Sequence, residues 1–254
     1  MNPIFKSQRI KLLAIRHFAE NGRKGAIRMC VYFIIFAFLP RLINSSLPLT
    51  SFIIFCIILV LGGIAFTAKI FQEIHQPASG MHYLHIPASR FEKFLFNGVL
   101  TLLYYPAVCL LLYYGATFFG NLIEPIMPSF LNYSTIDISL LLPAEHINKL
   151  ISQYVLIHAI FFLGSLTFKK HHTSKTFISL IVISIIIGII QSILFKIVWA
   201  DFIATSVGDS MSVTMSIENM FDLHLLPYAK WLFNGMITVF LWVVAYFKFK
   251  EKQV

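Results

Sequence analysis

Five stretches of this chain are apolar, free of Asp, Glu, Lys and Arg, and about as long as a membrane-spanning helix. The hydrocarbon core of a bilayer is roughly 30 Å thick, and about 20 helical residues cross it. Shorter stretches can be accommodated by tilt or local thinning of the bilayer. We therefore predict membrane-spanning helices within residues 42–68, 94–123, 150–168, 176–195 and 231–247.

A further apolar stretch, residues 29–40, is too short to cross a membrane unaided. Extended to residue 44 it becomes long enough, because Arg28 and Arg41 can reach toward opposite interfaces and keep their guanidinium groups in water. The alternative is that this stretch enters and leaves on the same side. That arrangement would leave five spans and put the two termini on opposite faces.

The distribution of positive charge favours six spans. Cytoplasmic segments of membrane proteins carry an excess of Lys and Arg. With six spans, 16 of the 20 Lys and Arg residues fall on one side, whereas five spans would put the seven amino-terminal charges outside. We therefore predict a multi-pass membrane protein with both termini in the cytoplasm. The positive charges left outside are Arg41, Lys149, Lys196 and Lys230.

Composition agrees with this fold class. The chain has 254 residues, of which 58% are hydrophobic and 12% charged, which lies outside the range of soluble domains. We predict an all-α polytopic membrane protein forming one domain over residues 1–254. Residues 1–25 form a cytoplasmic or interfacial segment, residues 26–247 the six spans, and residues 248–254 a cytoplasmic tail. The net charge of +9 indicates topology and contact with anionic lipid, and a nucleic-acid surface explains it less well.

The amino-terminal segment mixes apolar and basic positions. Residues 5–20 are compatible with a helix lying along the membrane interface, and the alternative is a solvated basic tail. We predict a hinge at residues 21–25, where the chain would turn into the membrane.

The loop between the second and third predicted spans, residues 72–93, carries the clearest local signals outside the membrane. Pro77 and the Ser-Gly pair that follows should end the preceding helix, and Pro87 favours extended backbone before it. Ser89 and Glu92 have the spacing of a capping box, in which each side chain accepts a hydrogen bond from the other residue's backbone N–H. We therefore predict a helix that begins there and continues into the third span.

The same loop resembles type-2 ABC transporter permeases, particularly the small six-span members of the Bacteroidetes lineage. The family's signature after its second span is leucine, proline, alanine and serine, followed by glutamate and lysine. The six-span layout and the short basic tail, residues 245–254, are also similar to these permeases. His85 and Ile86 depart from the more uniformly apolar residues of the family, so no subfamily or substrate is assigned. The matching residues are Tyr83-Leu84-His85-Ile86-Pro87-Ala88-Ser89 and Glu92-Lys93-Phe94.

The resemblance implies a permease subunit of an exporter of the bacterial inner membrane, which dimerises and is driven by a separate cytoplasmic ATPase. The chain itself has no G-x-x-x-x-G-K-[ST] loop to bind nucleotide phosphates, so we expect no catalytic or cofactor-binding role in it. Without the resemblance, the capping box is simply a well-defined helix start. On the permease interpretation, the partner-coupling residues are Tyr83, Leu84, Pro87, Ser89, Glu92 and Lys93.

A second hypothesis rests on histidines. A stand-alone membrane enzyme or a metal-responsive protein could use the histidines of the predicted cytoplasmic side. Zinc sites need a compact set of His, Cys or carboxylate ligands, and no such set completes this group. We therefore interpret them as interfacial titrating groups and predict no metal. These histidines are His75, His82, His85, His171 and His172.

Few polar side chains lie within the predicted spans. None is Asp or Glu, which argues against a proton-coupled carrier and against an aspartyl intramembrane protease. His158 and Gln191 are the sizeable polar residues at depth, and we expect each to form a hydrogen bond between helices. Pro106 could kink its span.

Overall fold

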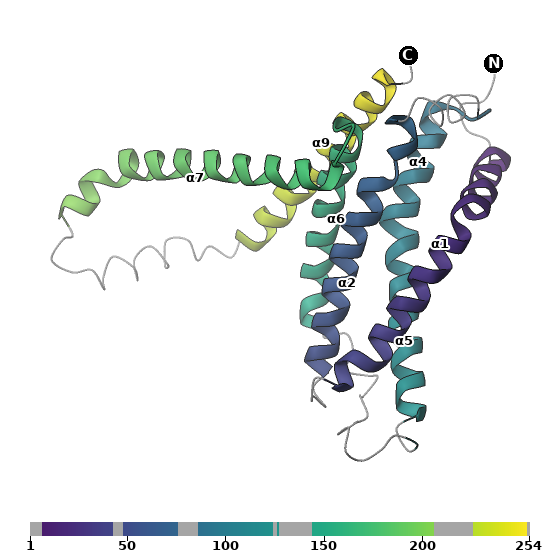
Figure 1. Ribbon diagram of the computed structural model, residues 1–254. Coiled ribbons are helices and arrows are strands. Elements are labelled where there is room, and N and C mark those ends of the chain that lie inside the picture. Colours follow the sequence, from purple (N-terminus) through teal and green to yellow (C-terminus); the bar gives the residue numbers. More distant parts are fainter. Residues whose placement is uncertain are drawn as a thin grey trace.

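The computed structural model describes residues 7–42, 48–75, 86–123, 126, 144–205 and 226–252. Within these ranges the chain is helical apart from short turns, which confirms the all-α prediction (Figure 1). The α-helices are α1 (Ser7–Leu42), α2 (Pro48–Lys69), α4 (Arg90–Val99), α5 (Tyr105–Ile123), α6 (Ala144–Thr167), α7 (His172–Thr205) and α9 (Leu226–Glu251); a 3-10 helix, η1 (Gln72–His75), follows α2, and a π-helical segment, η2 (Leu100–Tyr104), joins α4 to α5.

Five helical stretches of the described chain are long and apolar enough to cross a membrane. They lie in α2, in α4 through α5, in α6, in α7 and in α9, where the sequence predicts spans. The first predicted span lies within α1, which is not among the five. Its apolar part is short and is bounded by Arg28 and Arg41. The protein is thus an all-helical membrane protein, and the sixth span stays a prediction.

Helix ends rich in Lys and Arg gather at one end of the bundle, which we call the basic end. There α1 and α4 begin and α2, α6 and α9 end (Figure 1). A cluster of buried side chains joins these ends: Phe71 after α2, Phe162 and Leu166 on α6, and Phe249 on α9. The segments predicted to share the cytoplasm therefore lie together. The side of the membrane that this end occupies stays a prediction.

A second cluster of buried side chains joins α1, α2 and α5 farther from the basic end. The rings of Phe55 and Tyr113 stack with centroids 4.7 Å apart, and Phe36 packs edge-on against Tyr113. All three side chains are essentially inaccessible to solvent. α6 packs on both α2 and α9, and it therefore connects these two helices within the bundle.

The predicted hinge at residues 21–25 is wrong. α1 is a single helix of 36 residues that passes through this segment without a break. At Gly22 and Gly25 no neighbouring atom lies within 4 Å of the position that a Cβ would occupy, so nothing packs there to bend the helix. A glycine within a helix lowers its stability but ends it only where other interactions favour a turn.

Arg41 is completely buried between α1 and α5, which corrects the expectation that it reaches toward a membrane interface. Its Nη1 donates to the carbonyl of Ala37 at 2.6 Å, and its Nη2 donates to the carbonyl of Thr117 at 2.9 Å and to the side-chain oxygen of Asn121. Gly120 makes room for it, because a Cβ there would lie 2.5 Å from the guanidinium carbon. These oxygens replace the water that a cation loses on burial.

The third predicted span is continuous but not uniform. α4, η2 and α5 follow one another without a gap, and the π-helical turn lies just before Pro106. A π turn carries one residue more than an α turn, so it rotates the helix faces on its two sides relative to each other.

α7 projects outward from the bundle, across the direction of α2 and α6 (Figure 1). It follows His171, whose backbone is left-handed with φ 54°. Its second turn packs so closely on α6 that a Cβ at Gly164 would lie 2.2 Å from Thr176 Oγ1. Residues 181–194 are all exposed in the single chain. Because that length is apolar on every side, it needs lipid or protein around it.

Candidate functional site

The predicted capping box is present at the start of α4. The N–H of Ser89 donates to Glu92 Oε2 at 2.7 Å, and the N–H of Glu92 donates to Ser89 Oγ at 3.1 Å. Glu92 is completely buried, and Arg9 Nη1 on α1 lies 3.9 Å from its Oε2. The box therefore defines where the loop ends and where the helix begins.

Four of the six predicted coupling residues lie in the described ranges. Pro87 is exposed and Ser89 is half-buried, whereas Glu92 and Lys93 are 0% and 4% exposed. In this arrangement Glu92 and Lys93 can hold the end of the loop in place, but they present no surface to a partner. The remaining predicted residues of the loop, outside the described part of the chain, are Tyr83 and Leu84, together with the helix-ending Pro77.

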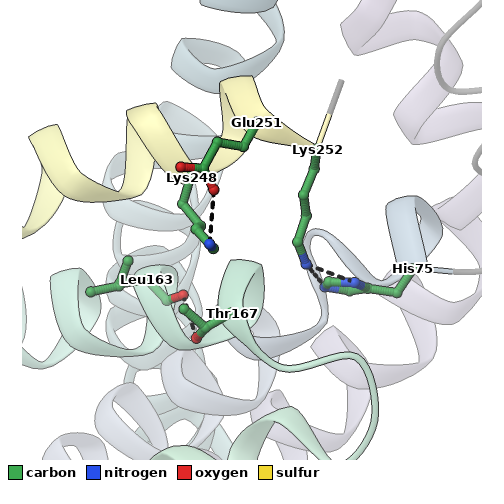
Figure 2. Close-up of polar contacts among 6 residues, drawn as sticks. All are labelled: His75, Leu163, Thr167, Lys248, Glu251 and Lys252. Carbon is green, nitrogen blue, oxygen red and sulfur yellow. Dashed lines mark hydrogen bonds and ion pairs between the residues drawn. The ribbon is translucent and has the colours of Figure 1, made fainter. Parts of the chain in front are cut away.

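The other end of the loop is held by His75. Its Nε2 lies 2.8 Å from the carbonyl oxygen of Ser165 on α6. Lys252, at the end of α9, reaches across to the same ring, with Nζ 3.1 Å from Nδ1 (Figure 2). The ring of His172 on α7 stacks on that of His75, with centroids 5.0 Å apart. Four helical elements therefore meet at His75.

These contacts define the protonation state of His75. An ammonium group only donates hydrogen bonds, so Lys252 requires an acceptor at Nδ1, and the Nε2–H must donate to Ser165. Burial lowers the pKa of His75 below 6.5, the bond to Ser165 partly opposes this, and the charge of Lys252 lowers the pKa further. The pKa of Lys252 is also lowered, first by burial and then by Lys169 and Lys248. His75 is therefore neutral in this structure.

Of the five histidines singled out in the sequence, the structure brings His75 and His172 together. His171 is exposed, and His82 and His85 lie outside the described ranges. Among the residues that the structure describes, no group of three or more His, Cys, Asp or Glu could hold a metal ion. Both ring nitrogens of His75 already have protein partners.

The predicted hydrogen bond between helices is confirmed for His158. Its Nε2 lies 2.7 Å from Thr101 Oγ1, in the π-helical turn, and the hydroxyl of Tyr154 donates to the carbonyl of Thr101 at 2.9 Å. Thr101 and His158 are almost fully buried. Gln191 lies on the exposed length of α7, and the same expectation for it stays a prediction.

Together these features define an all-helical membrane protein with a loop anchored at the basic end of its bundle. Comparison of the chain with protein-family models, with curated proteins and with solved structures gives no match.

Proposed function

We propose that this chain is the membrane-spanning permease subunit of an ABC exporter, acting as a dimer with a separate cytoplasmic ATPase. The proposal is supported by the resemblance of the loop to the permease signature. The observation that carries it is that the described residues on both sides of residues 76–85 are held in place, His75 by the carbonyl of Ser165 and Ser89 by Glu92. In this proposal, a partner that displaces these flanking residues also displaces the adjoining ends of α2 and α4.

In this proposal the partner supplies ATP hydrolysis, and the chain itself carries no catalytic group. The exposed Pro87 and the loop before it would contact the ATPase, while Glu92 and Lys93 keep the end of the loop in position. Closure of the two ATPase subunits would then alternate access to a path between two copies of this chain. Its substrate is unassigned.

The test is affinity capture of the chain from its native host, followed by mass spectrometry of the co-purifying proteins. We expect a stoichiometric ATP-binding ABC subunit. Glu92→Arg should abolish capture, because it breaks the box and buries an unpaired cation, whereas Glu92→Gln can still accept the N–H of Ser89 and should retain it.

Glu20→Arg is the matched control, since it changes the net charge equally at an exposed position on α1. If a correctly inserted Glu92→Arg protein still captures the ATPase, the result would contradict the coupling role assigned to the loop. A preparation with no ATPase at all would contradict the permease proposal.

A metal-responsive protein is the second candidate, favoured by the stacking of His75 on His172. Metal would have to displace Lys252 from His75 and recruit further ligands. Metal analysis of the purified protein separates the two proposals, because a stoichiometric zinc content that is lost in His75→Gln would support this one. No bound metal would remove it.

A further inference from the structure

A cleft of about 610 Å³ opens at the basic end of the bundle, between α1, α2 and the start of α4. One wall is formed by α1 between Leu13 and Tyr32, another by α2 between Gly62 and Lys69, and the third by α4 between Lys93 and Asn97. The volume is that of a small-molecule site. We call this cavity the basic cleft.

Positive charge dominates the basic cleft. Its lining contains five cationic side chains and one carboxylate, Glu20, which already accepts a hydrogen bond from Arg16 Nε at 2.7 Å. The cations come from three different helices, so their convergence is a property of the fold rather than of one basic segment. They are Arg16, Lys24 and Arg28 on α1, Lys69 on α2 and Lys93 on α4.

A second cavity of about 190 Å³ adjoins the basic cleft, and we call it the apolar annex. The two cavities share part of their lining, including Arg28, Tyr32 and Phe66. The rest of the annex is largely apolar. It is formed by side chains of α1 and of the helix that runs through α4 and α5, among them Phe18, Ala26, Met29, Tyr104 and Val108.

We infer that the basic cleft and the apolar annex together bind an anionic amphiphile, with its phosphate group in the cleft and part of a hydrocarbon chain in the annex. Arg and Lys side chains donate charge-assisted hydrogen bonds to phosphate oxygens. Basic pockets between membrane helices on the cytoplasmic side bind phospholipid head groups. The inference goes beyond the permease proposal and holds whether or not an ATPase binds.

The annex distinguishes two sources of the phosphate. A membrane phospholipid would use both cavities, whereas a soluble phosphate ester would use the basic cleft alone. An apolar extension adds binding free energy only for a ligand that carries a hydrocarbon chain. The arrangement therefore favours a phospholipid.

The experiment measures lipid binding to the full chain, delipidated in a neutral detergent, by native mass spectrometry. The probes are phosphatidylglycerol, the zwitterionic phosphatidylcholine, and glycerophosphoglycerol, which is phosphatidylglycerol without its acyl chains. We expect phosphatidylglycerol to bind about 10-fold more tightly than phosphatidylcholine, since only the anionic lipid gains net attraction from the cleft. Excess glycerophosphoglycerol should displace little of it.

Paired substitutions test the cleft. Arg28→Gln with Lys69→Gln removes two lining cations and should weaken phosphatidylglycerol binding about 10-fold. Arg23→Gln with Lys175→Gln removes two exposed cations elsewhere on α1 and α7 and should leave binding nearly unchanged. An equal loss in both variants would show general attraction to a basic surface and would overturn the inference.

Gly25→Leu tests the annex. Gly25 lines this cavity and has no atom within 4 Å of a Cβ placed on it, so a leucine can fill the annex without displacing the backbone. We expect weaker phosphatidylglycerol binding, while Gly235→Leu, at an equally open position on α9, should have no effect. Unchanged binding in Gly25→Leu, together with efficient displacement by glycerophosphoglycerol, would assign the site to a soluble phosphate ester and overturn the phospholipid inference.

Discussion

At the scale of single residues, two buried charges stabilise opposite ends of the bundle in the same way. Arg41 at the end of α1 is bonded to carbonyl and amide oxygens, and Glu92 at the start of α4 is bonded to a backbone N–H. In each case the protein's own polar groups replace water around the charge. Displacing these polar groups should therefore lower the free energy of unfolding more than replacing the charged side chain itself.

Gly120 should be indispensable only while Arg41 is present. In the wild-type background Gly120→Ala displaces the guanidinium group from its oxygens and should lower the free energy of unfolding by about 2 kcal/mol. In an Arg41→Met background the same alanine should cost much less. Thermal unfolding in detergent, arranged as a double-mutant cycle, measures the difference, and equal costs in the two backgrounds would show that Arg41 does not depend on Gly120.

Acid should weaken the contacts of His75. The folded pKa lies below 6.5, so above 6.5 the histidine is neutral in both states and the stabilisation is complete. As pH falls, the unfolded chain takes up the proton first, and the stabilisation is lost through the folded pKa.

The melting temperature should therefore fall between about pH 7.5 and about pH 5.5. His75→Gln should fall less, because glutamine keeps both hydrogen bonds without titrating. His171→Gln, at an exposed position, is the control. A pH profile identical in wild type and His75→Gln would contradict the assignment.

Hydrogen bonds between residues close together in the sequence could be predicted from the sequence. The Ser89–Glu92 box joins residues only three positions apart, so its spacing alone predicts it. The bond between Arg41 and Asn121 joins residues 80 apart, and that between His75 and Lys252 joins residues 177 apart. No local pattern marks such partners, because they meet only after the helices have packed.

At the scale of the helical elements, the π-helical turn rotates the faces of α4 and α5 relative to each other, and its own Thr101 contacts α6. Hydropathy predicts that a span exists at residues 94–123, because apolar length alone decides that. It does not predict the extra residue in the turn at Leu100–Tyr104, which depends on the fit of Thr101 against Tyr154 and His158. The hinge predicted in α1 is wrong for the same reason: glycines bend a helix only where tertiary contacts favour a bend, and these contacts cannot be read from the local sequence.

Thr101→Val should lower the free energy of unfolding by about 1–3 kcal/mol. It keeps the shape of the side chain but leaves His158 Nε2 buried without its partner, and His158 Nδ1 already has none among the described residues. Thr238→Val is the control, because that hydroxyl bonds within its own helix, to the carbonyl of Asn234. Chemical denaturation in detergent compares the two, and similar losses would contradict the role of the Thr101–His158 bond.

At the scale of the whole molecule, α7 is the least buried of the five candidate spans that the structure describes. Residues 181–194 are exposed, yet they are mostly isoleucine. The sequence predicted a span there but not its departure from the bundle, because apolar content requires only an apolar environment and does not specify the neighbour. Lipid is one such environment and a second copy of the chain is another.

In native membranes, a cysteine at position 186 should resist a water-soluble maleimide. The measurement uses Ile186→Cys in a chain whose three cysteines are replaced by serine, with Lys170→Cys as the exposed reference. We expect labelling at 170 and little at 186, because a charged reagent does not enter hydrocarbon. Equal labelling at both positions would place α7 in water and contradict its assignment as a span. The replaced residues are Cys30, Cys56 and Cys109.

The left-handed turn at His171 gives α7 mechanical leverage. A helix of 34 residues is about 50 Å long. It is attached to the bundle through its first two turns, where Thr176 packs against Gly164 and the ring of Phe177 packs on that of Phe161. A rotation of only about 10° at this attachment would therefore carry the far end of the helix through about 9 Å, given its length. The stiffness of this short attachment thus controls how far α7 can swing as a single rod.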